Sequence, residues 1–530
     1  MRFRYAIAAA LFALAAPAAG GPAGAATLRW SFQGPLASLD PYSLNETFTL
    51  STLGNVYEGL TRRGAKLEME PGLAERWETL DPKHWRFHLR KNVKFQNGEP
   101  FTADDVLFSA ERVRAKGSDL TTRIPADAKF EKVDDYTVDV RLATPAPTLP
   151  NEWDTWYIMS KSWAEKNNAV NPVSASDKNP NYAAYHANGT GPFVIDSHEP
   201  GVRTVMKPNP QWWDKRTHNI DEAVLTTVKA DPTRVAALLS GEVDWVDPVP
   251  VQDVQRVNAN KGTKVLSEPE LRTIFLGFNQ MGDELKSSNV KGKNPFKDVR
   301  VRRAFFQAID IEAIKSKVMR GLAAPAALPI SPLLFSRAGE FHRLPHDPAA
   351  AKKLLEEAGY PNGFEVTMDC PNDRYVNDEQ ICQAVVAMLA RIGVKVNLLA
   401  QTKSKYFAKV LASGGYDTDF YLLGWTPSGF DSLNVLDNIV GCRDAAGHGG
   451  MFNLGGYCNP KVTELTNRIR VESDKTKRDD LIAQAYRITT DEVALIPLHQ
   501  QALVWGVSDK LELVQRADNT FMIWHVTKKE

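Results

Sequence analysis

The chain has 530 residues, which is enough for a large core and too many for a single domain. Its 64 Lys and Arg balance its 64 Asp and Glu, and no basic block is present, so nothing indicates a nucleic-acid partner. The 12 Trp and 32 Pro are typical of loop-rich proteins that hold organic ligands between aromatic rings, although large two-layer proteins also bury Trp in their cores.

The first 26 residues predict a cleavable signal peptide. Arg2 and Arg4 precede an apolar run over 5–16, and small residues follow over 18–26. The apolar run is too short to anchor the protein across a bilayer. No Cys lies near the cleavage zone, and no later stretch is long and apolar enough to cross a membrane. We therefore expect a soluble periplasmic protein without a lipid anchor.

The elements that follow alternate between strands and helices, which predicts an α/β protein with mixed sheets. Residues 166–188 are polar and predict a linker or a long surface loop. The expected strands are 28–32, 85–89, 136–142, 203–207, 243–246, 272–279, 365–369, 394–399 and 416–423. The expected helices are 47–58, one opening at Thr102, one opening at Asp231, then 298–309, 347–359, 379–392, 406–411, 461–470 and 476–491.

Four cysteines lie in the last third of the chain. An even number of Cys in an exported protein predicts disulfides, and pairing neighbours joins Cys370 to Cys382 and Cys442 to Cys458. Zinc binding is the alternative. It is disfavoured because the chain has no C-x-x-C and only His448 lies inside the second loop.

No enzyme motif is present. The chain lacks G-x-S-x-G, H-E-x-x-H, an S-x-x-K set and a phosphate-binding P-loop. The Gly-x-Gly at 189–191 lacks the residues that complete a nucleotide fingerprint, and Pro345 separates His342 from His346. We therefore expect a binding protein, not an enzyme, without metal or cofactor.

The stretch 414–434 is a candidate wall of a ligand cleft. A short apolar and aromatic run over 416–423 predicts a buried strand, which ends just before Trp425. Turn formers follow, among them Ser428, Gly429 and Asp431. A strand that delivers a Trp and an Asp into a loop suits a binding site, while the alternative is a core strand followed by an ordinary turn.

Seven stretches together carry a family resemblance. The chain resembles the large periplasmic solute-binding proteins of the dipeptide- and oligopeptide-binding type, family 5 of the extracellular solute-binding proteins, over essentially the whole mature sequence. The stretches are SLDP (38–41), NVYEGL (55–60), FHLRKNVKF (87–95), FTADDV (101–106), GTGPF (189–193), DVRVRRA (298–304) and AKKLLEEAGY (351–360).

The resemblance implies the class II fold of periplasmic binding proteins, in which two lobes close on a cleft and a third domain is inserted. The expected division follows the mature chain after the signal peptide at 1–26. Domain I takes 27–58, 187–279 and 478–530, domain II takes 59–186, and domain III takes 280–477.

The resemblance also implies a partner for a peptide carboxylate. In dipeptide-binding relatives an Arg after the strand that matches 364–369 takes this role, and Arg374 is the nearest match. A guanidinium suits a carboxylate because it forms two parallel hydrogen bonds. The alternative is a solvated loop arginine. Phe32 and Gln33 at the end of the first strand are further candidate contacts.

The family meets the peptide ammonium with an Asp three residues after the Trp that matches Trp425, and here that position is Ser428. Either Asp431 reaches the ligand from a differently shaped loop, or the ligand lacks that charge. Trp425 is expected to stack on the ligand, and Asn434 to donate and accept hydrogen bonds from the same loop.

The leading hypothesis is a monomeric periplasmic component of an ABC importer that captures short peptides or peptide-like solutes and delivers them to inner-membrane permease subunits. A second hypothesis keeps the fold but changes the ligand to an oligosaccharide, an opine-like conjugate or a metal chelate. A third is a secreted hydrolase, against which the missing motifs argue.

Overall fold

The computed structural model describes residues 26–529 except 176, 373 and 444–448. The predicted signal peptide, apart from Ala26, lies outside the described residues, as does His448. Within the described ranges, no helix is both long and apolar enough to cross a bilayer.

A seven-stranded sheet of order β12-β19-β11-β1-β10-β9-β8 collects segments from both ends of the chain. The central strand β1 runs parallel to β10 and β11, and the other pairings are antiparallel. The strands are β1 (Ala26–Phe32), β8 (Phe193–Glu199), β9 (Arg203–Pro208), β10 (Ile220–Thr227), β11 (Trp245–Asp247), β12 (Thr263–Leu266) and β19 (Trp505–Ser508). The helices α1 (Thr47–Leu53), α4 (Asp231–Ser240) and α5 (Val254–Ala259) accompany them.

Tryptophans hold the core of this sheet together. Trp30, Trp245 and Trp505 come from three neighbouring strands and are all buried. The rings of Trp245 and Phe521 stack with centroids 3.9 Å apart, and Trp245 meets Trp505 edge-on at 5.1 Å. Much of the high Trp count therefore belongs to the core, as do Trp153 and Trp156 in the neighbouring region.

A four-stranded antiparallel sheet of order β4-β5-β7-β6 shares a continuous core with the seven-stranded sheet. A bidentate ion pair between Asp40 and Arg112, both fully buried, ties the N-terminal segment to this region at 2.5 and 2.8 Å. The elements here are β2 (Thr61–Arg63), β3 (Met69–Pro71), β4 (Ala74–Asp81), β5 (His84–Leu89), α2 (Ala103–Arg114), β6 (Lys129–Asp134), β7 (Thr137–Arg141) and α3 (Lys161–Lys166).

The second large sheet has six strands in the order β14-β18-β13-β17-β15-β16. Its strands are β13 (Pro269–Phe278), β14 (Ala323–Pro325), β15 (Glu365–Pro371), β16 (Lys395–Gln401), β17 (Phe420–Trp425) and β18 (Leu495–Ala502). The surrounding helices are α6 (Val299–Ala308), α7 (Ile311–Ala313), α8 (Pro348–Glu357), α9 (Asp378–Ala390), α10 (Lys403–Val410), α11 (Ser432–Asn438), α12 (Pro460–Val471) and α13 (Lys475–Asp491).

Helices cover both faces of this sheet, which explains the unbroken apolar run in β17. Phe420 and Leu422 face a core shared with α6, α8 and α9, while Tyr421 and Leu423 face a core shared with α11, α12 and α13. The strand begins at Phe420, four residues later than predicted, and extends to Trp425.

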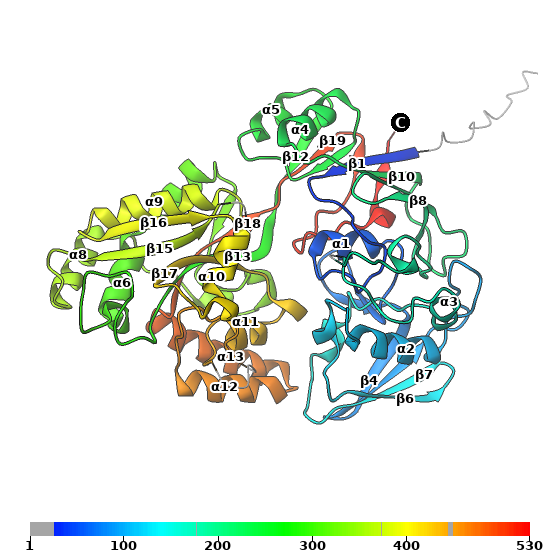
Figure 1. Cartoon of the computed structure of the whole chain (residues 1–530), viewed down its shortest axis with the longest axis horizontal. Coiled ribbons are helices and arrows are strands. Elements are labelled where there is room, and N and C mark those ends of the chain that lie inside the picture. The colour runs from blue at the N-terminus through cyan, green and yellow to red at the C-terminus, as the bar shows by residue number, and fades with distance from the viewer. Residues whose placement is uncertain (1–25, 176, 373, 444–448, 530) are drawn as a thin grey trace, which may run out of the picture.

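We call residues 26–266 and 505–529 the first lobe and residues 269–502 the second lobe. The chain passes between them twice, from β12 to β13 and from β18 to β19, and the two lobes lie side by side (Figure 1). The crossings are paired, because the backbone N–H of Leu503 donates to the carbonyl of Glu268 at 2.9 Å. The predicted domain I included β13 and β18, whereas both are strands of the six-stranded sheet. The last pair of strands, β20 (Leu511–Glu512) and β21 (Thr527–Lys528), belongs to the first lobe.

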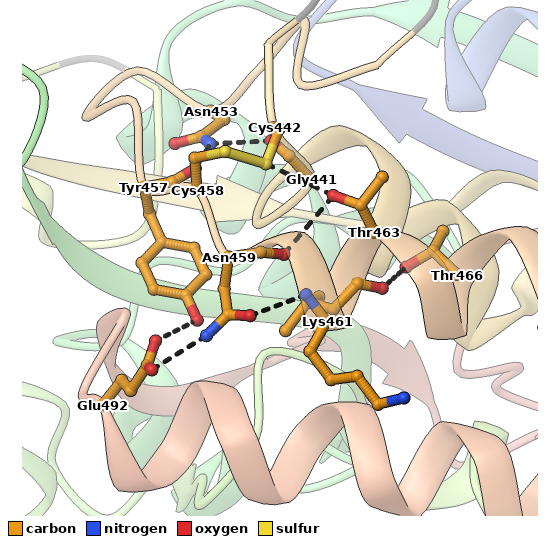
Figure 2. The surroundings of a disulfide bond; sticks show 11 residues. Gly441, Cys442, Asn453, Tyr457, Cys458, Asn459, Lys461, Thr463, Thr466 and Glu492 are labelled. Carbon is orange, nitrogen blue, oxygen red and sulfur yellow. Dashed lines mark hydrogen bonds between the residues drawn. A yellow bond between two sulfur atoms is a disulfide. The ribbon is translucent and has the colours of Figure 1, made fainter.

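Both predicted disulfides form, and both lie in the second lobe. Cys370 at the end of β15 is bonded to Cys382 in α9. Around the Cys442–Cys458 bond, Asn453 donates to the carbonyls of Gly441 and Tyr457 at 2.8 and 2.6 Å (Figure 2). Each disulfide therefore closes a short loop that hydrogen bonds also hold.

Candidate ligand-binding cleft

A cleft with a volume of about 440 Å³ lies where the chain crosses between the lobes. Small-molecule sites in proteins range from about 300 to 1,000 Å³, so this cleft suits a small ligand. It is lined from both lobes by Phe32, Gln33, Thr47, Asp231, residues 247–252, Asn519, Glu270, Arg272, residues 374–377 and residues 501–504.

Parallel pairing brings the first-lobe wall together. Phe32 at the end of β1 pairs with Asp247 at the end of β11, so the carboxyl ends of two parallel strands meet at one edge. The ring of Phe32 stacks on Phe48 with centroids 3.8 Å apart, and Gln33 follows it into the cleft. Phe32 and Gln33, two predicted contact residues, thus line the cleft.

The second-lobe wall is the loop between β15 and α9, whose two ends the Cys370–Cys382 bond joins. The Asp378 carboxylate accepts hydrogen bonds from the backbone N–H groups of Arg374 and Tyr375, both at 2.9 Å. The Tyr375 hydroxyl donates to the carbonyl of Gly424 at 3.2 Å. These bonds fix the backbone from which the Arg374 side chain enters the cleft.

Arg374 has an available charge. Among the described residues, no carboxylate lies within ion-pair distance of its guanidinium, and no hydrogen bond engages that group. Partial loss of solvation in the cleft, with the nearby guanidinium of Arg272, lowers the pKa of Arg374. An arginine in this setting gains from an incoming anion, because the anion replaces lost solvation.

Arg272 is paired within the cleft. Its Nη2 lies 3.3 Å from Oε1 of Glu270, and Nε2 of Gln501 donates to the other Glu270 oxygen at 3.0 Å. Both Glu270 and Gln501 are buried. The Glu270 carboxylate is therefore neutralised and hydrogen-bonded in the absence of ligand.

Asp247 has no such cation. It is only 8 % exposed, and within the described ranges no Lys, Arg or His reaches ion-pair distance of its carboxylate. Burial and the neighbouring Glu270 raise the pKa of Asp247 to about 7, while Arg234 and a hydrogen bond from Asn519 act in the opposite direction. The cleft thus carries one acid and one base whose charges lack a protein partner.

The structure brings three predicted contact residues together outside this cleft. Nε1 of Trp425 donates to Oδ1 of Asn434 at 2.8 Å, and Nδ2 of Asn434 donates to Oγ of Ser428 at 2.9 Å. The Trp425 ring packs on Phe452 at 4.7 Å. The polar groups of these side chains are hydrogen-bonded within the set. Their contact with a ligand stays a prediction.

Asp431 is engaged as well. Its two carboxylate oxygens accept from Nη1 and Nη2 of Arg478, both at 2.7 Å, and one of them also caps α11 through the N–H of Leu433. This arrangement is bidentate, which is the strongest geometry for such a pair. An ammonium at Asp431 would have to compete with Arg478.

The same loop, residues 428–431, contacts the first lobe. The guanidinium carbon of Arg63 lies 4.2 Å from the centre of the Phe430 ring, and its Nη2 donates to the carbonyl of Gly429 at 3.4 Å. Gly429 has a φ of 63° and lies so close to the Glu152 carboxylate that a Cβ would collide with it. Burial raises the pKa of Glu152 to about 7. The loop therefore forms an interlobe contact.

Sequence reasoning missed Asp247, Glu270 and Arg272. Glu270 and Arg272 are two residues apart at the start of a strand, which places them on one face. A charged pair at the start of an otherwise apolar strand was the available signal. For Asp247 the signal was an acid directly after the short strand predicted at 243–246.

The model of the bacterial extracellular solute-binding proteins, family 5 (Middle), matches residues 68–447. The chain belongs to this family. The glutathione-binding protein GsiB of Escherichia coli O157:H7 is 26% identical over 479 residues, covering 89% of each chain. Heme-binding protein A of Haemophilus influenzae is 29% identical over 456 residues, covering 81% of this chain and 79% of the relative.

Solved structures share the fold of this family 5 chain. The periplasmic binding protein DppA from Helicobacter pylori, solved in complex with the peptide STSA, superposes with a TM-score of 0.74 at 23% identity, covering 96% of this chain and 98% of that one. The described residues contain no group of three or more His, Cys, Asp or Glu side chains that could hold a metal ion.

Proposed function

We propose that this chain is the periplasmic substrate-binding component of an ABC importer, and that it captures a short peptide or peptide-like solute between its lobes without chemical turnover. The observation that carries the proposal is Arg374, which lines a cleft between the lobes and whose guanidinium, apart from a cation–π contact with the Tyr375 ring at 5.1 Å, has no ion-pair or hydrogen-bond partner among the described residues. The relative GsiB is named for glutathione, itself a short peptide with a free amine and free carboxylates.

The cleft chemistry supports a ligand with a carboxylate. Closing the lobes removes the ligand from water, so each of its charges needs a partner. Arg374 would meet a terminal carboxylate with two parallel hydrogen bonds. Phe32 and Gln33 would contact the ligand from the first lobe.

The paired crossings near 267 and 503 are the natural hinge of this proposal. Two short connections restrain the lobes less than a broad interface would, and such connections absorb domain closure in other binding proteins. In this account domain I takes 26–58, 187–266 and 505–529, the inserted domain takes 59–186, and the other ligand lobe takes 269–502. Export by the predicted signal peptide and delivery by a monomer to inner-membrane permease subunits complete the proposal.

A non-peptide ligand is the second candidate. Ser428 stands where an acid would meet a peptide ammonium, and Asp431 is already paired with Arg478. The relative heme-binding protein A is named for a ligand that is not a peptide. Both observations favour testing the ligand class directly.

The test is mass spectrometry of the small molecules released when periplasmically produced protein is denatured, with a thermal-shift screen of short peptides. We expect a ladder of short peptides and stabilisation by peptides with a free carboxylate, lost in Arg374→Ala. A single non-peptide species, with no thermal shift from peptides, contradicts the peptide proposal. Product formation from peptides or esters contradicts the absence of turnover.

A further inference from the structure

We propose that Asp247 forms a cation subsite at the first-lobe edge of the cleft, so that the favoured ligand is a zwitterion whose ammonium or guanidinium meets Asp247 while its anion meets Arg374. This inference rests on the proposed binding function and names the charge pattern of its ligand. The supporting observation is that Asp247 lines the cleft, is 8 % exposed, and within the described chain has no ion-pair partner.

The backbone around Asp247 is held in place. Nη2 and Nε of Arg234 donate to the carbonyl of Pro248 at 3.0 and 3.3 Å, and the N–H of Val249 donates to the carbonyl of Val504 at 2.8 Å. Register pairing with Phe32 fixes the residue from the other side. Hydrogen bonds on one side and strand pairing on the other therefore fix the backbone that carries the Asp247 carboxylate at the cleft.

The nearby Arg234 does not neutralise Asp247. Arg234 is fully buried, and its guanidinium donates to the carbonyls of Val228 and Pro248 and to Oδ1 of Asp231 at 2.5 Å. The guanidinium N–H groups of Arg234 thus donate to acceptors other than Asp247, and no ion pair joins Arg234 to Asp247 in the described residues. A carboxylate beside a cation that is already engaged still needs a charge of its own.

The balance of charges across the cleft specifies a zwitterion. Three acids, Asp231, Asp247 and Glu270, and two bases, Arg272 and Arg374, line the same cavity. Asp231 is paired with Arg234 at 2.5 Å. Glu270 and Arg272 pair with each other at 3.3 Å. That leaves one negative and one positive group, so a ligand with one cation and one anion satisfies both.

This subsite also explains how the chain dispenses with an acid at position 428. In the 425–434 loop the one nearby acid, Asp431, is held by both terminal nitrogens of Arg478. Asp247 offers the missing negative charge on the opposite lobe, where a ligand would bridge it to Arg374. Burial next to Glu270 raises the pKa of Asp247 to about 7, as expected of a carboxylate that lacks a counterion.

The test compares a library of unblocked tripeptides with the same library N-acetylated, by calorimetry on the full-length protein. We expect acetylation to weaken binding to the wild type at least tenfold. Asp247→Asn should weaken unblocked peptides at least tenfold and leave acetylated peptides within twofold. Glu242→Gln is the matched control, because Glu242 is an exposed acid of the first lobe that does not line the cleft, and it should bind both libraries as the wild type does.

Equal affinity of the wild type for unblocked and acetylated peptides overturns the subsite and leaves peptide binding intact; this comparison does not depend on how any variant folds. Unchanged binding of unblocked peptides by Asp247→Asn overturns it too. If no peptide binds, peptide capture fails, and the molecules released from the purified protein decide the subsite. If the wild type releases a cationic or zwitterionic molecule that Asp247→Asn does not retain, the subsite is supported. If the released molecule carries no cation, the subsite is overturned. It is also overturned if no molecule is released and neither arginine nor glycine betaine shifts the melting temperature.

Discussion

The 425–434 loop and the first-lobe edge of the cleft differ in how their polar groups are used. In the loop, Trp425, Ser428 and Asn434 bond to one another, and Asp431 is paired with Arg478. At the cleft, Asp247 and Arg374 lack charged partners among the described residues. A charge is available to a ligand only where the fold has not already engaged it, and the loop pattern alone could not reveal this.

The largest expected effect comes from removing the carboxylate that pairs with Arg478 in the 425–434 loop. Asp431→Asn keeps an N-cap oxygen but leaves Arg478 without its carboxylate, and the pair is mostly buried, at 17 % and 10 % side-chain exposure. We expect the free energy of unfolding in urea to fall by about 3 kcal/mol, because removing one partner strands a buried charge. Peptide affinity should stay within threefold.

Ser428→Ala is the comparator for this prediction. Ser428 is exposed and accepts one hydrogen bond from Asn434, so we expect a loss below about 1 kcal/mol. A large loss of peptide affinity in Asp431→Asn, without loss of stability, would show that Asp431 serves the ligand and not the fold.

Arg374→Ala tests the cleft side. We expect about a 100-fold loss of affinity for peptides with a free carboxylate, which corresponds to about 2.7 kcal/mol for a bidentate charged contact. C-terminally amidated peptides should bind the variant and the wild type alike, as measured by calorimetry. Arg374→Lys keeps the positive charge but cannot form two parallel hydrogen bonds. Its affinity for peptides with a free carboxylate should lie between those of the wild type and Arg374→Ala.

The pH dependence of stability tests whether Asp247 lacks a counterion. Its pKa rises from 3.8 to about 7 on folding, because of burial and Glu270, against the opposing effects of Arg234 and Asn519. The native state then binds the proton more tightly than the unfolded state, so this group's contribution is complete below pH 3.8 and is lost as the pH rises through 7.

Asp247→Asn removes that loss. We expect the variant to gain stability relative to the ligand-free wild type between about pH 5 and 8, on the order of 2 kcal/mol, with no difference near pH 3.5. Glu152 titrates in the same range, so the comparison is the difference between variant and wild type across pH in urea unfolding. A constant difference at all pH values would contradict an unpaired Asp247.

A further prediction concerns the contact that the loop makes with the first lobe. Phe430→Ala removes the ring 4.2 Å from Arg63, and we expect a loss of about 1 kcal/mol in thermal or urea unfolding. Arg63 keeps its ion pair with Asp154 at 2.8 Å, so the fold should persist. If the stability of Phe430→Ala equals that of the wild type, the contact between the loop and the first lobe contributes no net free energy to folding.

Local patterns predicted the elements that local forces determine. The strand β17 was predicted from its apolar run, which arises because both faces of the strand are buried. The disulfides were predicted because each closes a short loop. Phe32, Gln33 and Arg374 were placed at the cleft through the family resemblance. The alternative that large proteins bury Trp also holds, since Trp30, Trp153 and Trp505 are core residues.

What escaped the sequence depends on partners far apart in the chain. Whether Asp431 is free depends on Arg478, 47 residues later, and whether Glu270 is satisfied depends on Gln501, 231 residues later. The lobe boundary at β13 escaped for the same reason, because its pairing with β18 is set by tertiary contacts. No local pattern reports which of several acids the fold will leave unpaired.

The most direct test of the account is a crystal structure of the protein with its co-purified ligand. We predict a carboxylate or equivalent anion on both terminal nitrogens of Arg374 and a cationic group within hydrogen-bond distance of Asp247, with the Asp431–Arg478 pair intact. A ligand cation bound at Asp431 or Ser428, with Asp247 contacting no ligand, would contradict the account.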